Sequence, residues 1–250
     1  KKFSKNLIIK NVLKNIWRLI MKLAFSWDDG ALEDQKLFEL HEKYQIPGMF
    51  FVPTKNREGR EVLSPNIIKR AESQYVSFGG HTDNHTYLTT IPLQDVEEEV
   101  LKNKKYLEDL LGHEILDFCL PGGKYTPEIN KLVFKHYRTI RTADTMNFSY
   151  DGGFILKPSF HVYRRGLKSM LGNALRHNSF DELAYIMAHP LYGDFRLIRE
   201  IIERKKNSQA TIMIWGHSWE LEQYQLWGEL EEIFTLAKEI GCNSYSEMFT

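Results

Sequence analysis

The sequence predicts an α/β fold built on a parallel sheet, either closed as a barrel or left open, and three observations support this. Short apolar runs alternate with helical patterns from Met21 to the end of the chain. Seven or eight β–α units of this kind occupy roughly 230 residues, a rhythm typical of parallel sheets. The total length of 250 residues suits one large domain.

The predicted strands are short apolar runs, rich in aromatic and β-branched residues, and helical patterns separate most of them. They cover residues 22–27, 48–53, 75–80, 115–120, 137–142, 160–165 and 210–216, with 242–247 as an eighth candidate. Helices are expected over residues 64–73, 93–112, 126–137 and 226–241.

Helix boundaries carry recognisable signals. Ser64 and Thr126 stand at N-cap positions, and a proline follows each of them at the first helical position. Gly112 and Gly241 end the second and fourth predicted helices. No linker or low-complexity segment interrupts this rhythm, so we expect residues 21–250 to form a single domain.

Residues 1–20 differ from the rest because they predict a basic amphipathic helix. Such a helix can lie on an anionic membrane surface. We favour a helix docked on the domain, and a third option is that natural translation starts at Met21. Lysines interrupt the apolar part and no small-residue cleavage site follows, which argues against a signal peptide. The apolar positions are Ile9, Val12, Leu13, Ile16 and Ile20, and the basic ones are Lys10, Lys14 and Arg18.

Composition excludes several classes. Lys+Arg and Asp+Glu both number 33, so the formal net charge is zero and no basic field favours nucleic acid. The two cysteines, Cys119 and Cys242, imply no disulfide framework and indicate free thiols in a reducing compartment. No apolar run approaches the ~20 residues of a spanning helix. We expect a cytoplasmic protein, with the inner face of the membrane as the alternative location.

Three polar clusters fall at the ends of predicted strands, where parallel α/β barrels carry their catalytic residues. Asp28 and Asp29 follow the first strand, His81 and His85 follow the third, and His217 follows the strand at 210–216. Two imidazoles and one carboxylate suit a catalytic divalent metal with open positions. Asp28 and His217 are then left as an acid–base pair.

Each cluster also has a structural interpretation. Asp28 and Asp29 alone would suit a helix N-cap, because Gly30 and a helical run follow them. The histidine pair alone fits a polar surface loop, and His217 alone fits a satisfied structural histidine. Their joint occurrence at strand ends favours the metal interpretation.

From about Met21 to the C-terminus the sequence resembles the polysaccharide deacetylase family (the NodB-homology domain, carbohydrate esterase family 4). "SWDDG" at 26–30 resembles its Thr-Phe-Asp-Asp-Gly motif, and "HTDNH" at 81–85 its His-Ser/Thr-x-x-His motif. "KYQIPGMFFV" at 43–52 resembles its second-strand approach. "CLPGG" at 119–123 stands where Arg-x-Pro-x-Gly is usual, and the ending "WGHSWE" at 215–220 is similar to a divergent branch. The Asp-Trp fourth motif has no counterpart that can be placed.

The resemblance implies a deformed (β/α)7 barrel, an α/β fold. It also implies that Asp29, His81 and His85 bind a divalent metal, most often Zn2+ in this family. Such an ion can lower the pKa of bound water to about 7, as amide or ester hydrolysis at neutral pH requires.

The resemblance assigns the remaining roles as well. Asp28 would be the general base and His217 the general acid, and the backbone N–H of Gly122 would help to hold the oxyanion. These roles agree with elementary chemistry, since a carboxylate can accept the proton of water and a histidine can protonate a leaving amine near neutral pH.

Cys119 occupies the position of the family's motif-three arginine, which pairs with the catalytic aspartate, and it cannot supply a positive charge. Period-two alternation places Arg141 opposite Ile140 on the strand at 137–142. Ile140 should face the helices, so Arg141 should point into the barrel and contact Asp28. The alternative is a surface pair of Arg141 with Asp144.

The leading functional hypothesis is a metal-dependent hydrolase that removes acetyl groups from an N-acetylated amino sugar, which is free, lipid-linked or polymeric. A near rival removes formyl or O-acetyl groups. A carbohydrate-binding pseudoenzyme gains weight from Cys119, and a membrane-associated assembly factor would use residues 1–20. The identity of the sugar is not encoded in any motif.

Other polar and aromatic residues receive structural interpretations first. Aromatic residues that flank the clusters fill the core by default or stack on a sugar ring. The insertion at about 148–181 is expected to shape the site, and His161 within it can approach the site. The flanking aromatic residues are Trp27, Trp215, Trp219 and Tyr125, and the histidines interpreted as surface residues are His41, His113, His136, His177 and His189.

Overall fold

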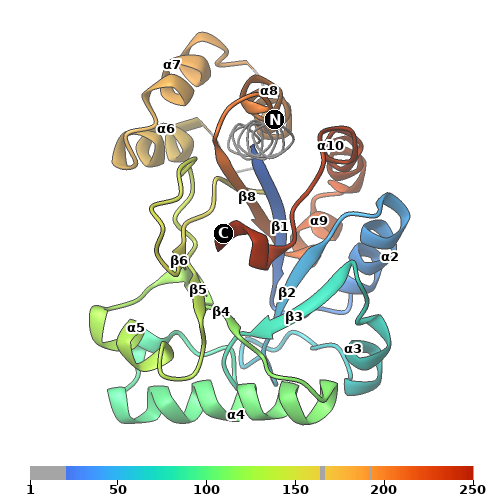
Figure 1. Ribbon diagram of the computed structural model, residues 1–250, viewed down its shortest axis with the longest axis vertical. Helices are drawn as coiled ribbons and strands as arrows, with labels where there is room; N and C mark the ends of the chain where they lie inside the picture. The colour runs from blue at the N-terminus through green and yellow to red at the C-terminus, as the bar shows by residue number, and fades with distance from the viewer. Residues whose placement is uncertain (1–20, 164–166, 192, 250) are drawn as a thin grey trace, which may run out of the picture.

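The computed structural model describes residues 21–163, 167–191 and 193–249, which form a curled parallel sheet with helices packed around it (Figure 1). The helix predicted at residues 1–20 lies outside the described residues. Within the described ranges the sheet has eight strands in the order β6-β5-β4-β3-β2-β1-β8-β7. The strands are β1 (Lys22–Asp28), β2 (Gly48–Val52), β3 (Val76–Gly80), β4 (Asp117–Cys119), β5 (Thr139–Arg141), β6 (Ile155–Leu156), β7 (Phe160–His161) and β8 (Thr211–Gly216).

Every strand pair in this sheet is parallel, which confirms the predicted deformed barrel. The edge strands β6 and β7 have two residues each, and no ladder joins them among the described residues. The curl is therefore open at this seam. Each of the seven predicted strand segments overlaps an observed strand, whereas β6 is too short for its sequence to have predicted it.

Helices cover the outer face of the curl (Figure 1). Thr126 caps the predicted helix that follows it, since its side chain accepts a hydrogen bond from the Ile129 N–H at 3.3 Å. Gly112 ends another predicted helix in a left-handed conformation with φ of 80°. Among the described helices, none is both long and apolar enough to cross a membrane. The helices are α2 (Asp34–Tyr44), α3 (Pro65–Ala71), α4 (Leu93–Leu111), α5 (Pro127–Val133), α6 (Leu167–Arg176), α7 (Phe180–Ala188), α8 (Asp194–Lys205), α9 (Ser218–Gln223) and α10 (Trp227–Ile240).

Strand β1 shows how the sheet sorts its side chains. Phe25 and Trp27 are fully buried in the large cluster between the sheet and the helices. Ala24 belongs instead to the cluster inside the curl. Because side chains alternate along a strand, Asp28 shares the inward face with Ala24. The last residue of β1 is thus directed to the mouth of the curl.

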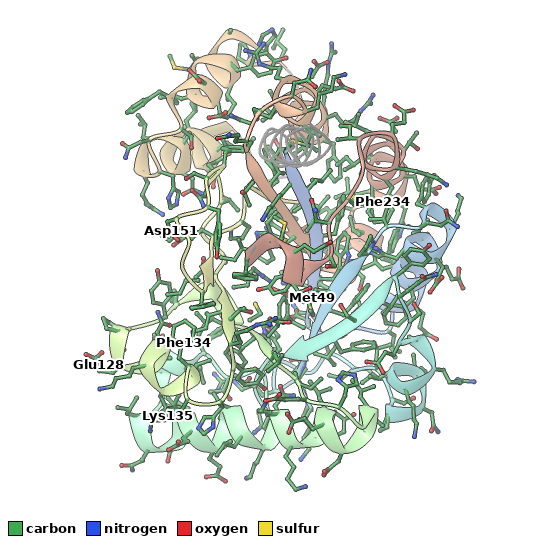
Figure 2. All side chains as sticks on the ribbon, viewed as in Figure 1. Met49, Glu128, Phe134, Lys135, Asp151 and Phe234 are labelled. Carbon is green, nitrogen blue, oxygen red and sulfur yellow. The ribbon has the colours of Figure 1, made fainter. Side chains whose placement is uncertain are left out.

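The C-terminal segment fills the inside of the curl, so the eighth strand predicted at 242–247 is wrong. The 3-10 turn η3 (Tyr245–Phe249) places Tyr245 and Met248 in the interior cluster that also contains Met49 (Figure 2). Ser244 begins this turn as in a capping box, with its N–H donating to the Glu247 carboxylate at 2.6 Å. The local capping and the space inside the curl together favour a turn over an extended strand.

His41 is fully buried, so its interpretation as a surface residue is wrong. Its Nε2 accepts a hydrogen bond from the Trp27 indole at 2.7 Å, and its Nδ1–H donates to the Ile46 carbonyl at 2.7 Å. The ring also meets Phe234 of α10 edge-on, with the ring centroids 4.9 Å apart. A neutral ring satisfies both neighbours, and burial lowers the pKa of His41 to about 4.

Acid should therefore destabilise the fold through His41. The unfolded chain binds a proton at this residue near the ordinary histidine pKa, whereas the folded chain binds it only near pH 4. The stabilising contribution is complete above about pH 6.5 and is lost as the pH falls toward 4, by about 3 kcal/mol in total. Urea unfolding of the wild type and of His41→Gln across this range measures the effect. The prediction would be contradicted if the unfolding free energy of the two proteins changed equally with pH.

Candidate active site

The chemistry-bearing residues converge at one rim of the sheet. Asp28 is the last residue of β1, His81 follows β3, and His217 follows β8. The carboxyl ends of parallel strands share one edge, and a cavity of about 350 Å³ opens there. The structure thus brings together residues predicted from three separate motifs. The cavity walls include Asp28, Asp29, His81, His85, Gly122 and His217.

Left-handed backbone conformations occur around this cavity. Asp29, Thr82 and His85 have φ values of 77°, 68° and 54°. Such conformations cost a non-glycine residue on the order of 1–3 kcal/mol, so surrounding contacts must hold them. The Thr86 N–H supports the loop by donating to the Thr82 hydroxyl at 2.9 Å. Gly30, at φ of 60°, lets the chain turn away behind Asp29, where an added Cβ would collide with β2.

Asp29, His81 and His85 form a buried group that fits a divalent metal ion. Asp29 Oδ1 lies 3.0 Å from His85 Nε2 and 3.5 Å from His81 Nε2. The His81 Nδ1–H donates to the Cys119 carbonyl at 2.9 Å, so the lone pair of Nε2 faces Asp29. The three ligand atoms lie within 4.8 Å of one another, and Asp29 Oδ1 has no hydrogen-bond partner among the described residues. This is a donor set that zinc and related ions accept.

Arg141 holds Asp28, which confirms the predicted contact. The fully buried guanidinium of Arg141 donates to Asp28 Oδ1. In the β4–β5 register Arg141 lies beside Cys119, so the positive charge expected at position 119 stands one strand to the side. The Cys119 thiol lies 3.5 Å from Asp28 Oδ2 as a donor, and burial raises its pKa well above the ordinary value. The alternative pair of Arg141 with Asp144 is wrong.

His217 adds a positive charge beside Asp29. Its Nε2 lies 3.9 Å from Asp29 Oδ2, and its Nδ1 lies 2.7 Å from Glu220 Oε2. Burial would lower the pKa of His217, but these two carboxylates outweigh burial and raise it to about 9. Burial would likewise raise the pKa of Asp29, but the neighbouring histidines, His217 foremost, hold it well below its usual range. The cavity therefore pairs an anionic Asp29 with a cationic His217 at neutral pH.

The rim also contains residues to which the motifs assign no role. Trp219 lines the cavity and donates its indole N–H to Asp29 Oδ2 at 3.0 Å, so it belongs to the site and not to the core. The Arg60 guanidinium lies over the Trp219 ring at 4.0 Å, and the Tyr87 hydroxyl donates to Glu58 at 2.8 Å. Arg60, Glu58 and Tyr87 come from loops, whose sequences carry no spacing signal.

Two more wall residues come from the last part of the chain. His161 is the described residue of 148–181 that lines the cavity, so the insertion contributes through this side chain. Trp215 also lines the cavity, whereas Trp27 is a core residue. Glu220 contacts both His161 and His217. Its spacing of three residues from His217 within "WGHSWE" was a signal that could have identified it.

Comparison with known proteins agrees with this geometry. The family model described as polysaccharide deacetylase matches residues 21–139. A peptidoglycan-N-acetylglucosamine deacetylase from Bacillus cereus is 28% identical over 115 residues, which are 45% of this chain and 50% of that protein. The match thus spans about half the length of this curated relative.

Solved structures share the fold over most of the chain. A peptidoglycan N-acetylglucosamine deacetylase in complex with a benzamide compound has a TM-score of 0.58 at 17% identity, covering 91% of this chain and 87% of its own. A mutant of a CE4 family pseudoenzyme with restored enzymatic activity has a TM-score of 0.56 at 13% identity, covering 92% and 67%. The predicted resemblance is confirmed, since the polysaccharide deacetylase model matches residues 21–139, which carry the first three motifs.

Proposed function

We propose that this chain is a metal-dependent hydrolase that removes the acetyl group from an N-acetylated amino sugar or glycan. The proposal rests on one observation: a single cavity places the Asp29, His81 and His85 group next to Asp28 and His217. The name of the Bacillus cereus relative supports an acetylated amino sugar as the substrate class.

Asp29, His81 and His85 would hold the ion, and zinc is the expected one because it takes imidazole and carboxylate ligands with an open position. When bound, the ion supplies Lewis acidity, which lowers the pKa of water to about 7 and offsets negative charge on a carbonyl oxygen. Neighbouring groups of the protein orient the residues that would bind the ion. The Cys119 carbonyl fixes the His81 ring, and the Trp219 indole fixes the second oxygen of Asp29.

Asp28 would accept the proton of the attacking water. Arg141 donates to one of its oxygens and the Cys119 thiol lies within reach of the other, so the carboxylate keeps one orientation at the cavity wall. General bases of this kind typically contribute about 10²–10⁴-fold in rate.

His217 would protonate the departing amine through Nε2, the nitrogen on the side of Asp29 and the cavity. Gly122 lines the same cavity with φ of 65°, a conformation that favours glycine. Its backbone N–H is the proposed donor to the oxyanion of the tetrahedral intermediate. Together these groups supply a base, an acid and an oxyanion donor around one reacting carbonyl.

A second candidate function is a carbohydrate-binding pseudoenzyme with the same barrel. Cys119 at the arginine position favours it. The contact of Arg141 with Asp28 counts against it, because this contact restores the charge that Cys119 lacks.

Acetate release tests the proposal directly. The purified protein is incubated with N-acetylglucosamine, its oligomers and peptidoglycan fragments, before and after chelation and zinc add-back. We expect acetate from at least one substrate, loss of activity on chelation, and recovery with metal. N-formyl and O-acetyl analogues separate the near rivals. Sugar binding without release of any acyl group would favour the pseudoenzyme.

A further inference from the structure

Two histidines share one carboxylate oxygen at the cavity wall. His217 Nδ1 lies 2.7 Å from Glu220 Oε2, and His161 Nε2 lies 2.8 Å from the same oxygen. All three side chains are buried or nearly so, with Glu220 7% exposed and His161 8% exposed. The two rings meet almost at right angles, with centroids 5.4 Å apart. Burial and two short hydrogen bonds to one oxygen therefore hold these three side chains together.

The chain places this cluster through two local features. Glu220 lies on α9, three residues after His217, so both side chains occupy the same face of that turn. His161 ends β7, where the strand register sets it beside Trp215 of β8. The His161 ring stacks on the Trp215 indole at 4.0 Å with an interplanar angle of 8°. The stacked ring therefore approaches Glu220 from a fixed direction.

The shared oxygen determines where protons lie. An ionised carboxylate only accepts hydrogen bonds, so His161 must carry N–H at Nε2 and His217 must carry N–H at Nδ1. Burial would raise the pKa of Glu220, but the two histidines outweigh burial and lower it to about 2. Glu220 thus remains ionised while His217 Nε2 is left for the cavity.

We infer that Glu220 is a positioning residue that keeps His217 Nε2 directed at the leaving group, and that His161 fixes Glu220 in place. This inference rests on the proposed function, because it assumes that His217 protonates an amine. In that step the C–N bond breaks, the amine nitrogen takes the proton from Nε2, and the acyl group leaves as acetate with an oxygen of water. Glu220 neither gains nor loses a proton.

A substrate whose leaving group needs no proton separates loss of His217 positioning from a general loss of active-site structure. Glu220→Gln preserves shape but removes the negative charge that holds the two histidine N–H groups. Its kcat for the N-acetylated sugar should fall by roughly 10²–10⁴-fold, the range of general acid catalysis, with KM little changed. Hydrolysis of para-nitrophenyl acetate should stay near the wild-type rate, because nitrophenolate departs without protonation. Glu222→Gln is the matched control and should change neither rate. Glu222 lies on the same helix and accepts a hydrogen bond from the Trp227 indole N–H at 2.7 Å.

A spectroscopic readout is independent of turnover. Nitrogen-15 NMR of the imidazole rings should show a hydrogen-bonded Nδ1–H on His217 in the wild type, and Glu220→Gln should alter this Nδ1 signal. His161→Asn should give an intermediate change in the His217 signal. If Glu220→Gln does not fold, Glu220→Asp takes its place as the test variant. Equal losses on both substrates, unchanged amide hydrolysis, or an unaltered His217 signal would overturn the inference. A wild type with the expected His217 signal but no amide hydrolysis would instead refute the proposed function.

Discussion

Replacing Asp28 with asparagine is expected to lower kcat for acetate release by about 10²–10⁴-fold, the usual contribution of a general base. Asparagine keeps the shape of the side chain but does not accept a proton at neutral pH. The metal ligands are untouched, so bound metal should remain. Steady-state kinetics with elemental analysis of the same preparation measure both quantities. A wild-type rate in Asp28→Asn would show that this residue is not the base.

Stability is the necessary control for that variant. Arg141 is fully buried, so asparagine at position 28 leaves its charge without a counter-ion. Breaking a buried ion pair from one side costs about 3–5 kcal/mol, whereas removing both partners is milder. The double variant Asp28→Asn/Arg141→Met should therefore unfold at a higher urea concentration than Asp28→Asn alone and still lack activity. Activity restored in the double variant would point to misfolding as the cause of the loss.

The position of the site could be predicted because it depends on local sequence. Each cluster directly follows or ends an apolar run, and parallel strands bring their carboxyl ends to one edge. Asp28, His81 and His217 therefore meet although they are far apart in the chain. The direction of Arg141 followed from strand alternation in the same way, since Ile140 packs into the cluster beneath the helices.

Contacts that depend on packing between distant elements could not be predicted. The environment of His41 is set by Trp27 and by helix α10, neither of which is near in the sequence. The sharing of Glu220 between His161 and His217 depends on the pairing of β7 with β8. Helical or strand periodicity shows which face a residue occupies, but it does not show which distant side chain that face meets.

Metal binding by Asp29, His81 and His85 at the rim of the sheet is central to the proposed function. We predict one divalent ion per chain in the wild type and none in His81→Ala/His85→Ala, because one carboxylate alone is too weak a ligand set for such an ion. The matched control is His113→Ala/His136→Ala, since these histidines pair with Glu72 and Glu97 away from the cavity. This control should retain the metal.

Elemental analysis after dialysis against trace metal measures this binding. We predict near-stoichiometric zinc or a related divalent ion in the wild type and in the control, with loss of both metal and acetate release in His81→Ala/His85→Ala. Stoichiometric metal retained by the His81→Ala/His85→Ala protein would contradict it.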